Sequence, residues 1–137
     1  IEQGIRESLD GGFLKGYPIV DAAISIEGGQ FDDRSNELAF SVCASMACKD
    51  ALENAKMGLL EPIMEVEVFV PDANMGDAIA DLNARGGKVE SINPKGNIQI
   101  IKAIVPLARM FGYSTALRSA SQGRGTFTMQ FAKFDRV

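Results

Sequence analysis

Two arginines lie among hydroxyl side chains and glycines in residues 110–127, the stretch best equipped for binding chemistry. Arg118 falls in a short predicted helix (114–120), and Arg124 falls in the turn Gln122–Gly125. Guanidinium groups, hydroxyls and exposed backbone N–H groups all donate hydrogen bonds to phosphate oxygens. No histidine or cysteine lies nearby to act as a base or a nucleophile. The stretch therefore favours contact with a phosphate backbone over catalysis. The alternative is that the glycines only set the turn geometry and the arginines are solvated surface charges.

Side chains that the common catalytic and metal-binding sites require are missing from the rest of the chain. The sequence contains no histidine, which excludes a histidine-based triad and a histidine-ligated metal. The pair Asp32–Asp33 fits a loop that solvates itself, and Asp77 with Asp81 fits an exposed pair near the start of a helix. The run Gly86–Lys88 lacks the following hydroxyl residue and the spacing of a phosphate-binding loop. We therefore predict no catalytic residue, no metal site and no enzyme activity in this chain.

Composition and charge limit the compartment and the partners. The net charge of −4 argues against a free-standing basic nucleic-acid binder, but it permits RNA contact through local basic patches in a larger assembly. No apolar run approaches the roughly 20 residues of a membrane helix. Cys43 and Cys48 lie roughly 140° apart around a predicted helix, so we interpret both as small buried hydrophobic residues in a reducing cytoplasm. We expect a cytoplasmic protein with neither a membrane nor DNA as its partner.

After a predicted domain boundary at Gly58, residues 59–137 show the order strand, helix, strand twice. Alternating apolar residues predict the strands, and apolar residues at helical spacing predict the first helix. The residues that carry these patterns are Met64, Val66, Val68 and Val70; Met75, Ile79 and Leu82; Ile101, Ala103 and Val105; and Phe127, Met129 and Phe131. The run Asn93–Asn97 joins the halves as a hairpin loop. The predicted fold is α+β, a ferredoxin-like β-α-β-β-α-β sandwich with both helices on one side of an antiparallel sheet.

The pattern of residues 1–58 predicts an incomplete α/β domain. A helix is expected at Ile1–Leu9, a strand at Ile19–Ile26, and a second helix that begins with Ser35 as N-cap and ends near Lys56. The second helix is apolar over so much of its circumference that it needs cover on more than one side. One strand cannot supply that cover. We therefore expect the chain to be a fragment of a longer protein, with the rest of this sheet before its first residue.

Several specific runs of residues follow one another along the chain. In the C-terminal region they are Met110–Tyr113 (MFGY), Leu117–Ser119 (LRS) and Gln122–Gly125 (QGRG). Further runs are Leu60–Met64, Val66–Val68, Gly76–Asp77, Asp81–Asn83, and Leu14, Gly16, Tyr17, Pro18, Val20 and Asp21. In their order and register these runs resemble elongation factor G, a GTPase that drives translocation on the bacterial ribosome. The resemblance covers essentially the whole chain. It implies that residues 1–58 are the C-terminal part of domain IV and that residues 59–137 are domain V.

The resemblance also implies a partner, the ribosome with its transfer RNA–messenger RNA complex. In this family domain IV reaches the decoding region, and domain V braces the factor against the sarcin–ricin loop and the GTPase-associated centre. GTP and magnesium are bound by an upstream domain, so no cofactor is expected in this chain. The residues that match positions against the sarcin–ricin loop are Arg118, Ser119 and Gln122. The other RNA-contacting donors expected here are Arg124, Arg85, Lys88 and Lys95, and the domain IV tip loop contains Phe31, Asp32 and Asp33.

Two alternatives to a translocase remain open. The family usually has histidine in the tip loop, within Tyr-His-Asp, whereas this chain has Gln30–Asp32. A paralogue for ribosome recycling or for tetracycline protection of the ribosome is therefore an alternative to a translocase. A free-standing ferredoxin-like domain that binds a small ligand between helix and sheet is the other alternative. An RNA-recognition motif is disfavoured, because the strand Asn97–Val105 has no aromatic residue and Ile63–Val70 has only Phe69 for base stacking.

Overall fold

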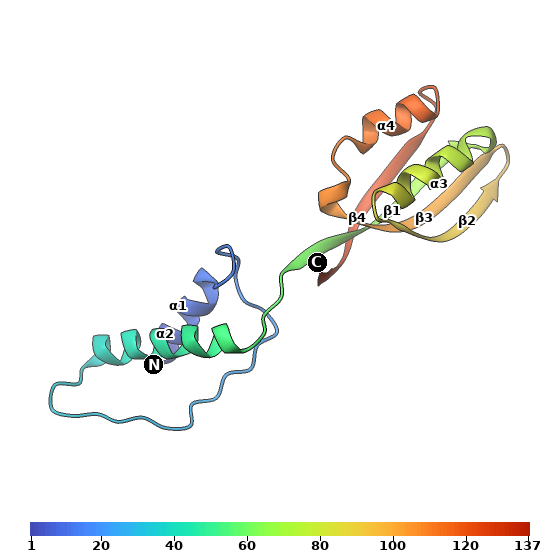
Figure 1. The fold of residues 1–137 in the computed structure, drawn as a ribbon. Coiled ribbons are helices and arrows are strands. Elements are labelled where there is room, and N and C mark those ends of the chain that lie inside the picture. Colours follow the sequence, from blue (N-terminus) through green and yellow to red (C-terminus); the bar gives the residue numbers. More distant parts are fainter. The chain divides into compact units, whose positions relative to one another are not determined.

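The structure, a computed structural model, describes all 137 residues, which form two compact units (Figure 1). The first unit is Ile1–Leu59 and the second is Leu60–Val137. None of the helices combines the length and the hydropathy that crossing a membrane requires.

The second unit is a four-stranded antiparallel sheet with two helices on one of its faces (Figure 1). Its elements are β1 (Leu60–Pro71), α3 (Met75–Ala84), β2 (Lys88–Lys95), β3 (Ile98–Pro106), α4 (Tyr113–Ala120) and β4 (Thr126–Arg136). A short 3-10 turn precedes each helix, at Asp72–Asn74 and Leu107–Arg109. The strand order is β2-β3-β1-β4, and every neighbouring pair is antiparallel. This arrangement confirms the predicted ferredoxin-like fold.

The core lies between the two helices and the two central strands. Val66 pairs with Ala103 and Val68 with Ile101, so alternate residues of β1 and β3 point to the same face. The fully buried residues of this layer are Val66, Val68, Val70, Leu82, Ile101, Ala103, Val105 and Tyr113, with Leu117 nearly so. Burial of each large aliphatic side chain contributes about 1.5–3 kcal/mol. The alternation predicted for β1 and β3 is therefore confirmed.

Strand β4 is partly buried only at Phe127, near its start. Phe127, Met129 and Phe131 lie opposite Val68, Val66 and Met64, so they share the face that the helices cover. The Phe127 ring packs edge-on against Tyr113 of α4, at 4.9 Å between centroids. From Thr128 onward every residue of β4 is exposed.

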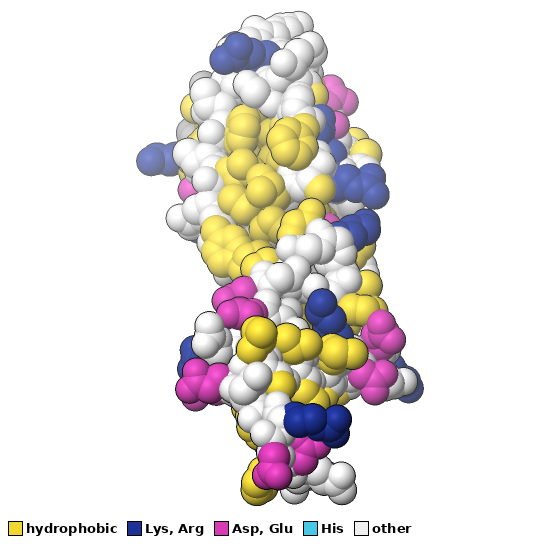
Figure 2. Space-filling view, turned by 90° about the vertical axis from the view of Figure 1, so that its left-hand side faces the viewer, with side chains coloured by type: hydrophobic (Ala, Val, Ile, Leu, Met, Phe, Trp, Pro, Cys, Tyr) yellow, Lys and Arg dark blue, Asp and Glu magenta, His cyan; other side chains and the backbone are white.

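The uncovered part of β4 forms an exposed hydrophobic row. Met129, Phe131 and Phe134 remain exposed, and the two phenylalanine rings lie 5.1 Å apart. Figure 2 shows hydrophobic side chains gathered in a broad area on the β4 side of this unit.

The hairpin between β2 and β3 is tighter than predicted. Asn93 and Pro94 belong to β2, where they pair with Ile100 and Gln99 of β3. Proline is tolerated here because β2 is an edge strand, which can spare an N–H group on its outer side. Only two residues, at positions 96 and 97, remain between the strands, and Gly96 adopts a positive φ of 63°. The predicted loop Asn93–Asn97 is therefore wrong in extent.

The first unit contains two packed helices, α1 (Glu2–Gly11) and α2 (Glu37–Asn54). A Cβ atom at Gly4 would collide with the Ser41 carbonyl oxygen, so the close approach of the helices requires glycine there. The hydroxyls of Ser8 and Ser45 lie 2.7 Å apart and join the helices by a hydrogen bond.

Three predictions for this unit are wrong. Residues Ile19–Ile26 form no strand, because a strand needs a hydrogen-bonded neighbour and no other segment of the chain pairs with them. The N-cap of α2 is Asn36, whose side-chain oxygen accepts from the Ala39 N–H at 2.8 Å, and Ser35 bonds Asp32 instead. Cys43 is exposed, because only part of α2 faces α1, whereas Cys48 is buried as predicted.

The outer side of α2 also lacks the cover that its composition calls for. Leu38, Val42 and Met46 follow one another at four-residue spacing, and each is more than half exposed. The helix ends at Asn54, two residues before the predicted end. The first unit thus buries much less apolar surface than the second.

We predict that slow amide hydrogen exchange is concentrated in Leu60–Val137. The strands β1 and β3 have a partner on both sides and a covered face, whereas residues 17–34 of the first unit have no regular structure. Exchange followed by mass spectrometry of proteolytic fragments measures this directly. Equal protection of α2 and β1 would contradict the prediction.

Candidate nucleic-acid interface

Ser121 holds the turn that follows α4. Its hydroxyl donates to the Leu117 carbonyl oxygen at 2.6 Å and accepts from the Gly125 N–H at 2.7 Å, and the residue is fully buried. A Cβ atom at position 125 would lie 2.7 Å from this hydroxyl and 3.0 Å from Cγ of Leu117. Position 125 therefore requires glycine, and the turn has one well-defined geometry.

The backbone reverses direction at two residues with left-handed conformation. Gln122 has φ 55° and Gly123 has φ 79°. The Gly123 N–H donates to the Arg118 carbonyl oxygen at 2.8 Å, which gives the helix a Schellman end. Glycine is the usual residue at the position of Gln122, and a residue with a side chain costs about 1–2 kcal/mol there. The chain thus carries a long amide side chain where local stability favours none.

Four of the predicted contact residues gather at this end of α4. Arg118, Ser119, Gln122 and Arg124 are all exposed. The guanidinium groups of Arg118 and Arg124 form no ion pair and no hydrogen bond within the chain. We call Arg118, Ser119, Gln122 and Arg124 the α4 surface. It combines a fixed backbone with side-chain donors that are free to bind a phosphate group.

The lysines of the predicted set lie at opposite ends of β2. Lys95 adjoins the turn between β2 and β3. The Asp72 N–H donates to the Asn97 carbonyl oxygen at 3.1 Å, so this turn lies beside the 3-10 turn Asp72–Asn74. Lys95 therefore lies at the same end of the sheet as the α4 surface. Lys88 begins β2, seven residues and roughly 23 Å away along the strand. The predicted donors therefore do not form one cluster.

Arg85 makes its contacts within the domain. Its Nε bonds the Asp81 carboxylate at 3.0 Å, and its Nη1 donates to the carbonyl oxygens of Arg109 at 2.8 Å and Phe111 at 3.2 Å. The guanidinium carbon lies 5.1 Å from the ring centroid of Tyr113. Arg85 thus joins the end of α3 to the start of α4. Asp81 is paired with it, rather than being the exposed partner of another aspartate as predicted.

Tyr113 is buried against Arg85 and the core. The residue is 1% exposed, and its hydroxyl oxygen has no hydrogen-bond partner. Burial raises the pKa of Tyr113 to about 12; the nearby Asp81 carboxylate raises it further, and Arg85 opposes the shift. The protonated phenol is therefore strongly favoured in the folded state.

The tip loop of the first unit is closed by Asp32. Its carboxylate accepts from Nη2 of Arg34 at 3.0 Å and from the Arg34 N–H at 2.8 Å, and these bonds, the side-chain one most, lower the pKa of Asp32. Asp33 is exposed beside it. Phe31 is 82% exposed, so its ring is presented to solvent by a turn with internal hydrogen bonds.

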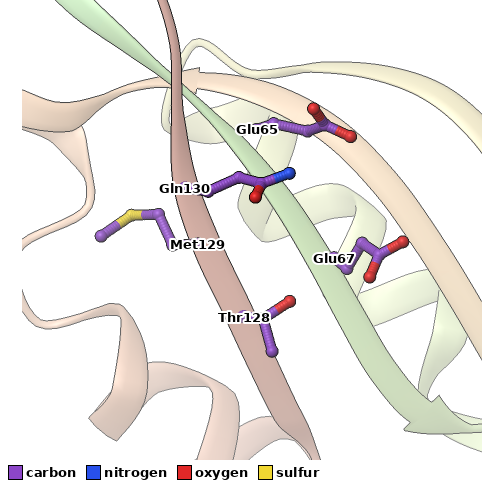
Figure 3. Close-up of a pocket in the computed structure, with 5 residues that line it drawn as sticks. All are labelled: Glu65, Glu67, Thr128, Met129 and Gln130. Atoms are coloured by element: carbon purple, nitrogen blue, oxygen red, sulfur yellow. The ribbon is translucent and has the colours of Figure 1, made fainter.

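A shallow depression of about 140 Å³ lies along the border of β1 and β4. Figure 3 shows Glu65, Glu67, Thr128 and Gln130 to one side of these strands and Met129 to the other. Lys102 of β3 pairs with Glu67 at 3.1 Å. The carboxylates make this sheet face a poor surface for RNA. No three His, Cys, Asp or Glu side chains lie close enough to hold a metal ion.

Two residues that shape the α4 surface were not predicted. Ser121 lies within residues 110–127, but only the structure shows that its side chain points inward. Asn74 lies far from this run in the sequence, and its side-chain amide donates to the Ala120 carbonyl oxygen at 2.9 Å. A contact between residues 46 positions apart leaves no local signal in the sequence.

Comparisons with known proteins give one consistent result. The family model described as Elongation factor G C-terminus matches residues 58–137, and the model described as Elongation factor G, domain IV matches residues 1–56. Elongation factor G of Aquifex pyrophilus is 49% identical over 138 residues, which is 100% of this chain and 20% of that protein. A crystal structure from Thermus thermophilus is 34% identical with a TM-score of 0.85, over 99% of this chain and 21% of that chain. The chain thus spans about a fifth of the length of each.

We predict that Ser121→Ala destabilises the second unit by about 1–3 kcal/mol, because the Gly125 N–H then stays buried without an acceptor. Ser119→Ala is the matched control, since Ser119 is exposed and its removal should change stability by less than about 0.5 kcal/mol. Urea unfolding followed by circular dichroism measures both. Equal stability of the two variants would contradict the role given to the Ser121 hydroxyl.

A second prediction concerns Tyr113 and alkaline pH. Its pKa is about 12 in the folded chain against an ordinary value of 10.0, so the folded state holds the proton more tightly. This contribution to stability is fully present below about pH 10 and is lost as the pH rises through about 12. Tyr113→Phe should lose less stability than the wild type as the pH is raised across this window. Parallel urea midpoints at each pH test this, and identical pH profiles would rule it out.

Proposed function

Because the chain belongs to the elongation factor G family, we propose that the α4 surface contacts ribosomal RNA and helps to dock a translation factor on the large ribosomal subunit. The observation that carries the proposal is the pair of exposed guanidinium groups, Arg118 and Arg124, which have no partner within the chain. Exposed arginines at the end of a fixed helix bind phosphate groups by charge-assisted hydrogen bonds.

The conformation of Gln122 supports the same proposal. A long side chain in the left-handed region costs stability, and such a cost is expected where the side chain serves binding. Ser119 and Gln122 add a hydroxyl and an amide next to the two guanidinium groups. Together they suit an RNA backbone, where contacts supply affinity and orientation rather than sequence readout.

Contact through the end of α4 fits this domain better than contact through its sheet. The open face of the sheet carries Glu65 and Glu67 at the border of β1 and β4, and carboxylates repel phosphate. Lys95 lies at the same end as the α4 surface and can extend it. We therefore assign Arg85 an internal role and leave it out of the proposed interface.

The wider assignment follows from the family. We propose that residues 1–58 act as part of domain IV and residues 59–137 as domain V, in the cytoplasm, with the sarcin–ricin loop as the RNA that the α4 surface contacts. Phe31, Asp32 and Asp33 are then the tip that reaches toward the decoding region. GTP hydrolysis is assigned to another part of such a factor, and no reaction is assigned to this chain. Roles in translocation, in recycling and in tetracycline protection are all compatible with this docking.

The alternative of a small ligand between helix and sheet has less support. That space is filled by buried side chains, including Leu82, Leu117 and Tyr113. Surface depressions lie elsewhere, one on the sheet between β1 and β4 and one beside α1 and α2.

We predict that Arg118→Ala weakens binding to purified large ribosomal subunits roughly ten- to a hundredfold, because one charge-assisted hydrogen bond worth about 1.5–3 kcal/mol is lost. The slope of the logarithm of the binding constant against the logarithm of the salt concentration should also become shallower by about one. The 137-residue chain, labelled on the exposed thiol of Cys43, serves for anisotropy titrations.

The matched control is Arg109→Ala, which removes an exposed arginine at the other end of the domain and should leave binding unchanged. Thermal melting of both variants separates docking from folding. Unchanged binding of Arg118→Ala together with a lower melting temperature would show that Arg118 is structural. Absence of binding by the wild type would refute the proposed function.

A further inference from the structure

Asn74 reaches across from the start of α3 to the end of α4. It lies in the 3-10 turn Asp72–Asn74, and its side-chain Nδ2 donates to the carbonyl oxygen of Ala120 at 2.9 Å. Ala120 is the last residue of α4. The contact therefore holds the backbone between Ser119 and Gln122, two members of the α4 surface.

Two other carbonyl oxygens at this helix end are held from within the same turn. The Leu117 carbonyl accepts from the Ser121 hydroxyl, and the Arg118 carbonyl accepts from the Gly123 N–H. The bond to Ala120 alone comes from another element. The contacts within the turn fix its shape, whereas the bond from Asn74 fixes where that shape lies on the domain.

This arrangement is not the most stable one for Asn74. Its Oδ1 atom is buried and has no hydrogen-bond partner, and its side chain makes no capping bond to α3. A buried acceptor without a partner reduces stability, and such a group calls for a specific explanation. Placement of the end of α4 gives that explanation, since a binding surface keeps its affinity only while its donors stay in place.

We propose that Asn74 is a positioning residue for the α4 surface, which it holds in the orientation that binds RNA without touching the RNA itself. The inference rests on the proposed function of that surface. The inference adds to that surface a residue from the 3-10 turn before α3, in a different part of the sequence. Asn74 acts through the Ala120 carbonyl, so its effect on binding should carry no electrostatic signature of its own.

The test compares Asn74→Ala and Asn74→Leu with Asn83→Ala. Both Asn74 variants lose the amide donor without adding a charge, and Asn74→Leu keeps about the size of the side chain. Asn83 is exposed on α3, and its side chain makes no hydrogen bond within the chain, so it is the matched control. Binding of the 137-residue chain to large ribosomal subunits is measured at about 25 °C over a range of salt concentrations, together with thermal melting.

Both Asn74 variants should bind about three- to tenfold more weakly, with the salt dependence of the wild type. Melting temperatures should fall by less than about 5 °C, so the variants stay folded at the temperature of the binding measurement. A residue that only stabilises the fold leaves affinity unchanged under these conditions. The Asn83→Ala chain should bind as the wild type does.

Three results would overturn the inference, and they differ from one another. A shallower salt dependence for Asn74→Ala would indicate that Asn74 lies in the RNA contact itself. Unchanged affinity of both Asn74 variants, with weaker binding by Arg118→Ala, would reject the positioning role and leave the proposed function in place. Unchanged affinity of Arg118→Ala as well would reject both.

Discussion

Strand β1 pairs with β3 on one side and with β4 on the other, and this double pairing determines the arrangement of the second unit. Side chains at alternate positions then share one face across three strands. Val66, Val68 and Val70 place a continuous apolar row at the centre of that face, and the two helices must cover it. Because α3 and α4 share this face, α4 lies over the β4 side. Its last turn reaches the margin of the domain, where side chains meet solvent.

The end of α4 separates buried structural residues from exposed polar ones within nine residues. Leu117, Ser121 and Gly125 point inward and fix the turn by packing and hydrogen bonds. The exposed positions between them include Arg118 and Arg124, whose guanidinium groups have no internal partner. A short run of sequence can therefore carry both the shape of a surface and its exposed polar groups.

Alternating apolar residues predict β1 and β3 correctly, because side chains covered by helices follow the two-residue period of a strand. The segment Ile19–Ile26 has a similar period and forms no strand, since pairing depends on a neighbour that the pattern does not reveal. Arg85 and Arg118 look equally free in the sequence. Arg85 is instead held by carbonyl groups 24 and 26 residues away, and Asn74 bonds a carbonyl 46 residues away. Contacts over such distances have no local pattern from which to infer them.

The open edge of β4 has a consequence for how the chain behaves at high concentration. An edge strand with exposed Phe131 and Phe134 offers unpaired backbone and apolar side chains to another chain, which is the usual route to sheet-to-sheet aggregation. Charged side chains follow this row closely. Lys133, with Asp135 4.0 Å from it, interrupts the apolar pattern at the C-terminal end of the strand. These charges act as gatekeepers, so their exchange for apolar residues should reduce solubility before it alters the fold.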